Sequence, residues 1–222
     1  MKRHVHEEIE LLKNKLLFMG SIAEEMLRLS AKVFLERKEG ISETIFQKEE
    51  EVNKLQMEID EMGVKILALY QPEATDLRTI LSSIKINAEL ERIADQAVNV
   101  TQTATYHLLK EVPVQSLMEI PKIATMAQEM IKESLDAFTK SDLTLAQNIL
   151  KKDQEVDLLK SKTLNEMIST ISHNPQQAKQ FVDLILIAKN LEKIADHATN
   201  IAEDVIFMVA GKDIRHHAQQ PS

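Results

Sequence analysis

The sequence predicts an all-α protein built from two tandem three-helix bundles that are related by internal duplication. The chain of 222 residues contains only four glycines and five prolines, so long stretches can remain helical without interruption. Apolar residues recur every three and four positions, which is the spacing of one helix face. One phrase, LERIADQAVNV at 90–100, returns as LEKIADHATNI at 191–201, with a constant offset of 101 residues.

The first predicted bundle covers residues 1–110. Gly40 marks a stop after the first helix, since glycine commonly follows the last helical residue. Ser42 is a suitable N-cap for the second helix. That helix is expected to end just ahead of Pro72, because the residue before a proline resists the helical conformation. The three helices are expected over about 5–37, 42–70 and 73–107.

The second predicted bundle covers residues 122–212. It follows a linker at 111–121, in which Pro113 and Pro121 are expected to interrupt any helix. The fourth and sixth helices are expected over about 123–140 and 175–210, and Ser141 or Asp142 is expected to cap the fifth. Residues 213–222 are expected to form a flexible polar tail.

An acid pair is the feature that the two copies of the phrase share. Glu91 and Asp95, and likewise Glu192 and Asp196, are four residues apart, so each pair projects from one helix face. At about 100° per residue, both pairs lie in line with the apolar face of their helix rather than opposite to it. Carboxylates that are partly removed from water are costly unless something neutralises them. We therefore expect either a metal cation or Lys and Arg side chains of neighbouring helices to balance both pairs.

The middle helix of each half carries a further acidic position. The segment EEEVN at 49–53 is similar to DQEVD at 153–157, with an offset of 104 residues. Asn99 and Asn200 lie about 80° round their helices from the motif glutamates and could add carbonyl oxygens. Oxygen ligands without thiolates suit Mg, Mn, Ca or Fe. The candidate metal ligands are Glu49, Asn53, Glu91, Asp95, Asn99, Asp153, Asp157, Glu192, Asp196 and Asn200.

The composition excludes several classes of function. The chain contains no cysteine, which excludes disulfides, zinc thiolate sites and cysteine nucleophiles and suits a reducing cytoplasm. Its formal net charge of −8 disfavours non-specific binding to nucleic acid. No stretch approaches the roughly 18 apolar residues of a membrane span. Acidic residues precede the first apolar run, so no signal peptide is expected.

The sequence shows no motif for catalysis. The four glycines, at 20, 40, 63 and 211, are too scattered to form a phosphate loop or a dinucleotide fingerprint. There is no G-x-S-x-G elbow. No histidine has a glutamate three residues before it, as di-iron carboxylate bundles require. We therefore expect a protein that is not an enzyme.

The two phrases resemble the duplicated signature of the PhoU family of phosphate-signalling regulators. The segment QPEATDLRTI at 71–80 also resembles that family, and the resemblance extends over nearly the whole chain. It implies a pair of three-helix bundles with E(D)xxxD motifs that bind metal, as iron clusters in some members. Those motifs correspond to the four acidic positions named above. Asn53 replaces a carboxylate in one of them, which implies weaker metal binding in the first bundle.

The resemblance also implies a regulatory role. We expect a cytoplasmic homodimer that represses phosphate uptake and the phosphate-starvation response. It would act as an adaptor between the phosphate ABC transporter, through its ATPase subunit, and the phosphate-sensing histidine kinase. The expected cofactor is a divalent or trivalent cation such as iron, Mg or Mn. One alternative is a metal-storage or metal-dependent hydrolytic bundle, and another is a structural helical module in which Lys and Arg neutralise the acids.

Overall fold

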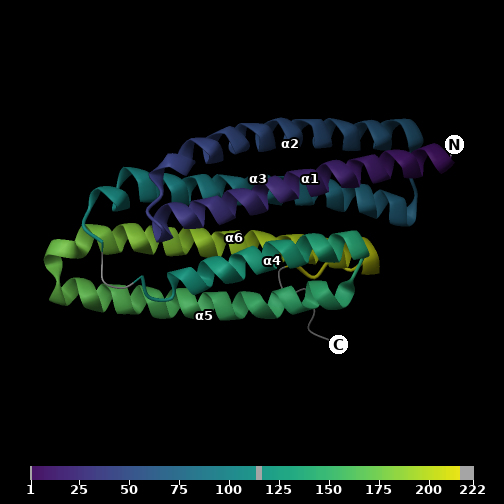
Figure 1. The fold of residues 1–222 in the computed structure, drawn as a ribbon. Helices are drawn as coiled ribbons and strands as arrows, with labels where there is room; N and C mark the ends of the chain where they lie inside the picture. Colours follow the sequence, from purple (N-terminus) through teal and green to yellow (C-terminus); the bar gives the residue numbers. More distant parts are fainter. Residues whose placement is uncertain (1, 114–116, 216–222) are drawn as a thin grey trace, which may run out of the picture.

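The computed structural model describes residues 2–113 and 117–215 (Figure 1). Among these residues there are six long α-helices and no β-strand. The long helices are α1 (Lys2–Leu35), α2 (Ser42–Tyr70), α3 (Ala74–Tyr106), α4 (Ile120–Lys140), α5 (Leu143–His173) and α6 (Ala178–Ala210). Three short 3-10 helices lie at the connections: η1 (Glu39–Ile41), η2 (Leu108–Lys110) and η3 (Pro175–Gln177). The predicted all-α fold is confirmed.

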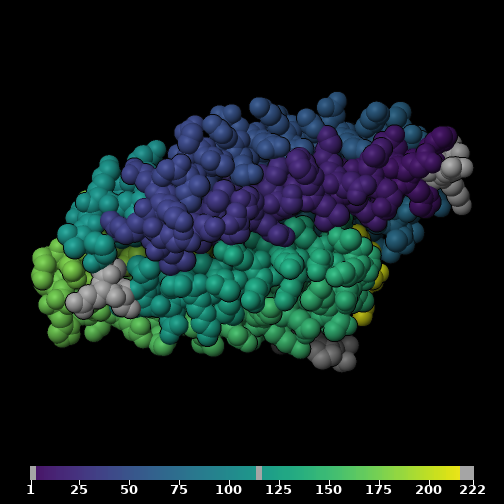
Figure 2. Space-filling view, viewed as in Figure 1, coloured from purple at the N-terminus to yellow at the C-terminus, as the bar shows by residue number. Residues whose placement is uncertain are grey.

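The two bundles pack against each other along their length. Helices α1, α2 and α3 form one bundle, and α4, α5 and α6 form the other, which lies below it in Figure 1. The most extensive helix–helix interface joins α3 to α6, and α1 packs against α4. Figure 2 shows α1 and α4 lying against each other on one face of the elongated molecule. The helices that carry the repeated phrase therefore form the centre of the structure.

A close approach at Gly20 helps to join the bundles. A Cβ atom at Gly20 would lie 2.6 Å from Cδ1 of Leu135, so the α4 side chain packs directly over the α1 backbone. Elsewhere the core is made by the predicted apolar faces; for example, Leu12, Leu16 and Met19 of α1 are fully buried. No helix in the described part of the chain is long and apolar enough to cross a membrane.

The helix ends match some of the predicted signals and not others. Asp142 is the N-cap of α5, and its carboxylate accepts hydrogen bonds from the backbone N–H groups of Thr144 and Leu145 at 2.9 and 3.0 Å. The prediction that Ser42 caps α2 is wrong, because Ile41 is the N-cap. The hydroxyl of Ser42 instead lies 2.9 Å from that of Thr105, and this bond ties α2 to α3.

The second half begins earlier than the proline signal predicted. Helix α4 starts at Ile120, so Pro121 lies in its first turn, where a missing N–H costs nothing because it would have no partner there. The residues from Pro175 first form η3, and α6 starts at Ala178 and ends at Ala210, with Gly211 as its C-cap at a φ of +67°. Of the predicted tail, residues 216–222 lie outside the described part of the chain.

Candidate functional site

The two copies of the phrase lie side by side where α3 packs on α6. Glu91 and Asp95 on α3, and Asp196 and Asn200 on α6, line one recess of about 560 Å³. Its other lining residues are Arg92, Gln96, Lys193 and His197. The fold therefore brings together acidic side chains that lie about a hundred positions apart in the sequence. Of the four motif carboxylates, Glu192 does not line this recess and lines a neighbouring cavity instead.

The carboxylates of α5 and α6 form what we call the second acidic cluster: Asp153, Asp157, Glu192 and Asp196. Burial raises the pKa of Asp196 to about 6, and the charges of Glu192, Asp153 and Asp157 add to the effect. Burial, Asp157 and Glu192 raise the pKa of Asp153. The amine of Lys160 lies 2.8 Å from Oε1 of Glu192 and 3.6 Å from Oδ1 of Asp157. A single lysine thus balances part of this charge.

The first acidic cluster consists of Glu49 and Asn53 on α2 with Glu91 and Asp95 on α3. Burial raises the pKa of Glu91, and Asp95 and Glu49 add to it. Burial and Glu49 raise the pKa of Asp95, while the charge of Arg92 opposes both shifts. The side-chain amide of Asn53 donates to Oε1 of Glu49 at 2.6 Å. Neither Glu91 nor Asp95 forms an ion pair with any residue that the structure describes.

The sequence left open whether a metal cation or Lys and Arg side chains balance the acids. The second explanation applies to the two clusters unequally. In the second cluster, Lys160 neutralises a motif glutamate directly. In the first cluster, Arg92 acts on the acids only at longer range. Carboxyl pKa values are raised in both clusters, first by burial and then by neighbouring acids, and the cationic side chains nearby do not offset these two effects.

The donor atoms suit a hard cation in their chemistry. They are carboxylate oxygens, together with the hydroxyl of Thr199, which lies beside Asp153 and by its hydrogen bond opposes the rise in the pKa of that carboxyl. Within the described ranges, however, no three His, Cys, Asp or Glu side chains converge closely enough to hold a metal ion. The clusters thus offer suitable oxygens in an open arrangement, and a cation would have to draw these side chains together.

The two predicted asparagine ligands lie in different surroundings. Asn200 lines the recess, and its amide donates to Oε2 of Glu89 at 3.0 Å. Asn99 is exposed and lies 3.5 Å from Gln96 on its own helix, outside the lining of the recess. His197 also contacts Glu89, with Nδ1 2.7 Å from Oε2. Burial alone would raise the pKa of Glu89, but these two hydrogen bonds, together with the charges of His197 and Arg92, lower it.

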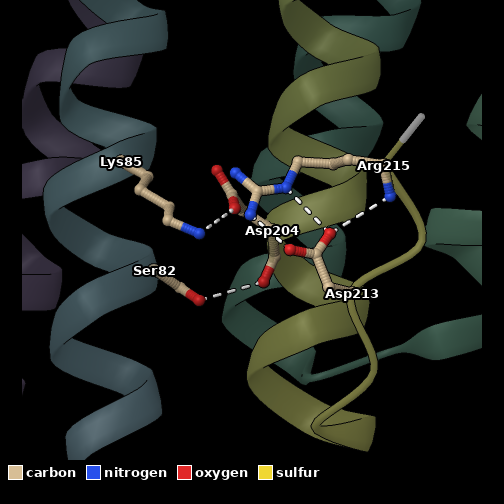
Figure 3. Close-up of polar contacts among 5 residues, drawn as sticks. All are labelled: Ser82, Lys85, Asp204, Asp213 and Arg215. Carbon is tan, nitrogen blue, oxygen red and sulfur yellow. Dashed lines mark hydrogen bonds and ion pairs between the residues drawn. The ribbon is translucent and has the colours of Figure 1, made fainter. Parts of the chain in front are cut away.

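A second polar contact joins α3 to α6 further along the interface. The amine of Lys85 lies 3.3 Å from Oδ1 of the buried Asp204, and the hydroxyl of Ser82 donates to the backbone carbonyl of Asp204 at 3.0 Å (Figure 3). Burial raises the pKa of Asp204 to about 6 despite this lysine. Beside it, Asp213 binds Arg215 (Figure 3). This contact stabilises the packing of the two bundles without adding to either acidic cluster.

Sequence reasoning missed three residues that shape the site. Lys160 could have been found, because it lies three residues after Asp157 and seven after Asp153, on the same helix face. Thr199 follows Asp196 by three residues and could have been included for the same reason. Glu89 gave no local signal, since its partners belong to the other bundle.

Comparisons with a family model and with curated relatives point to the same family. A family model described as "PhoU domain" matches the chain twice, over residues 16–104 and 120–205. A protein of Pseudomonas aeruginosa named "Phosphate-specific transport system accessory protein PhoU homolog" is 32% identical over 216 residues, covering 97% of this chain and 89% of the relative. A relative of the same name from Clostridium acetobutylicum is also 32% identical, with 96% and 98% covered.

Two crystal structures are similar to this fold. That of PhoU from Pseudomonas aeruginosa superposes with a TM-score of 0.90 at 33% identity, covering 93% of this chain and 99% of the other. The phosphate transport system regulatory protein PhoU from Streptococcus pneumoniae has a TM-score of 0.86, with 94% and 98% covered. At 20% identity, this second likeness shows the fold alone.

Proposed function

The chain belongs to the PhoU family, and on that basis we propose that it is a negative regulator of phosphate uptake and of the phosphate-starvation response. One observation carries this proposal. Relatives named as phosphate-specific transport system accessory proteins match 96–97% of the chain at 32% identity. Within that role we propose a cytoplasmic, dimeric adaptor that contacts the ATPase subunit of a phosphate ABC transporter and a phosphate-sensing histidine kinase.

The shape and charge of the molecule are compatible with an adaptor. Six long helices present extended surfaces, and the chain has a formal net charge of −8. Helical surfaces of this kind suit docking to partner helices or basic loops. The proposed role requires no catalytic step.

We further propose that a hard cation binds at the second acidic cluster. Supporting features are the raised pKa values of Asp153 and Asp196 and the hydroxyl of Thr199, a further oxygen beside Asp153. A cation there would neutralise the carboxylates and link α5 to α6. The first acidic cluster is the weaker candidate, because Asn53 supplies an amide in place of a carboxylate and is engaged by Glu49.

The regulatory role is tested by deleting the gene in the organism of origin. Expression of phosphate-starvation genes in phosphate-rich medium is expected to rise, and the wild-type chain is expected to restore repression. Pull-down with the transporter ATPase subunit and with the cytoplasmic part of the kinase tests the adaptor step. Unchanged expression after deletion would contradict the regulatory role, and failure to retain either partner would contradict the adaptor.

The cation is tested separately, by metal content and by Mn²⁺ and Fe²⁺ titration of the purified chain. A variant of the second acidic cluster is expected to lose bound cation, whereas a matched variant of the first cluster is expected to lose less. The first-cluster variant carries Glu49→Gln, Glu91→Gln and Asp95→Asn. The second-cluster variant carries Asp153→Asn, Asp157→Asn, Glu192→Gln and Asp196→Asn. Equal metal content in the wild type and the second-cluster variant would remove metal from the proposal while leaving the regulatory role intact.

A further inference from the structure

A second cavity, of about 300 Å³, lies between α5 and α6 beside the second acidic cluster. Apolar side chains of Leu164, Met167, Ile185 and Ala188 line it. Its volume lies at the lower end of the range for small-molecule sites, which are concave and mostly apolar with a few polar groups. The cavity is separate from the recess between α3 and α6, with which it shares no lining residue.

The cavity contains an unpaired polar atom. Thr163 is fully buried and lines the cavity, and its Oγ1 has no hydrogen-bond partner in the described part of the chain. A helical threonine commonly donates to the carbonyl one turn earlier, as Thr170 does to Glu166 at 2.8 Å. An unsatisfied buried hydroxyl is costly, and a ligand atom that bonds to it would remove that cost.

The duplication provides an internal reference for this cavity. With the repeat offsets, Gly63 corresponds to Met167 and Asn87 to Ala188. A Cβ atom at Gly63 would lie 2.8 Å from Cδ1 of Ile84, so α3 packs directly onto the α2 backbone there. The amide of Asn87 also reaches α2, donating to a backbone carbonyl at 3.0 Å and to a carboxylate at 2.9 Å.

In the second bundle both of these closing contacts are absent. Met167 places a long side chain where Gly63 allows close packing, and Ala188 is too short to bridge the helices. The counterpart of Thr163 is Ile59, so the buried hydroxyl is also specific to the second bundle. At this level the first bundle thus has close helix packing, while the second has an open, apolar cavity with one hydroxyl.

The charges around the cavity indicate the sign of its ligand. Three charged residues line it: Lys160, Lys189 and Glu192. Lys160 already pairs with Glu192 at 2.8 Å, so the exposed Lys189 is the one charged lining residue without an opposite charge beside it among the described residues. The other three carboxylates of the second acidic cluster do not line the cavity. We propose that this cavity binds a small amphipathic anion, an alkyl chain that carries a carboxylate. The chain would lie against the apolar wall, the carboxylate would face Lys189, and a carboxylate oxygen would accept a hydrogen bond from Thr163.

The proposal is tested by isothermal titration calorimetry and by ¹H–¹⁵N NMR, with octanoate as the probe. Octanol and octylammonium, of equal chain length, serve as matched ligands. Octanoate is expected to bind and to shift α5 and α6 amides around the cavity, with octanol weaker and octylammonium weakest. Absence of octanoate binding, or binding of octylammonium as tight as that of octanoate, would overturn the proposal.

Three variants sharpen the test. Ala188→Leu fills the cavity and is expected to weaken octanoate binding about tenfold or more. Thr163→Val keeps the shape and removes the hydroxyl, and is expected to weaken binding about fivefold. Lys189→Gln is expected to weaken octanoate about threefold and to leave octanol unchanged.

Lys151→Gln is the control, because it removes the same charge from an exposed position outside the cavity lining. It is expected to leave octanoate binding unchanged. Octanoate affinity that is undiminished in both Thr163→Val and Lys189→Gln would overturn the assignment, whether or not Ala188→Leu folds.

Discussion

The two acidic clusters reach the same net charge in different ways. The first has three carboxylates, from Glu49, Glu91 and Asp95. The second has four, offset by the amine of Lys160, which contacts two of them. In the first cluster an amide, Asn53, stands where the second has a fourth carboxylate.

The counterpart of Lys160 in the first bundle is Gln56, so the two clusters differ at this position as well as at the position of Asn53 and Asp157. A neutral pair, Asn53 and Gln56, corresponds to an ionic pair, Asp157 and Lys160, at the same positions of the helix. Repeated helices can therefore conserve the total charge of a site while changing how that charge is held. The ionic version depends on its lysine, whereas the neutral version has no such single support.

The largest expected difference between the clusters comes from removing that lysine. Lys160→Met leaves Glu192, whose side chain is only 15% exposed, without its ion-pair partner among the other carboxylates. We expect a loss of about 1–2 kcal/mol in the free energy of unfolding in metal-free buffer. Urea unfolding followed by circular dichroism measures this. The matched change Gln56→Met is expected to be nearly neutral, and equal losses in the two variants would contradict the comparison.

A smaller difference is expected from the motif aspartates. The folded state raises the pKa of Asp196 from 3.8 to about 6, so it binds the proton more tightly than the unfolded chain does. This contribution to stability is therefore present at low pH and decreases as the pH rises from about 4 to 6. Asp196→Asn removes the charge, and we expect about 1 kcal/mol of added stability at pH 7 in metal-free buffer.

The matched variant Asp95→Asn makes the same change in the first cluster, so its gain in stability can be compared with that of Asp196→Asn. The pKa of Asp95 is also raised, but among its acidic neighbours only Glu49 adds to the shift, and Arg92 opposes it. We therefore expect a smaller gain than for Asp196→Asn. Urea unfolding between pH 4 and 8 tests both variants. A gain for Asp196→Asn that is as large at pH 4 as at pH 7 would show that titration of this carboxyl is not its cause.

The fold was predictable because its determinants are local. Apolar spacing and the repeated phrase depend only on residues within one helix, and they were enough for six helices in two bundles. The helix starts were less predictable, since Ser42 bonds to Thr105 of another helix and Pro121 is accepted inside the first turn of α4. Such outcomes depend on tertiary partners that a local pattern does not contain.

In the candidate site, too, the features within one helix were predictable and the contacts between helices were not. The i, i+4 spacing predicted that each acid pair lies on one face. In the structure the charge of Asp95 raises the pKa of Glu91, and the charge of Glu192 raises the pKa of Asp196, as this spacing requires. That acids of both copies line a single recess follows from the packing of α3 on α6, which no spacing within one helix encodes. The contacts of Glu89 with His197 and Asn200 depend on that same packing.

The smallest expected effect comes from changing the first cluster stepwise into the second. Asn53→Asp removes the hydrogen bond to Glu49 and adds a fourth carboxylate to the first cluster, which we expect to cost about 0.5 kcal/mol. Adding Gln56→Lys supplies the lysine that the second cluster uses, and the double variant is expected to recover most of the loss. Urea unfolding of the two single variants and the double variant forms a closed cycle that isolates the coupling. Losses that simply add would show that Asp157 and Lys160 are independent substitutions, and the two clusters would then share their net charge by coincidence.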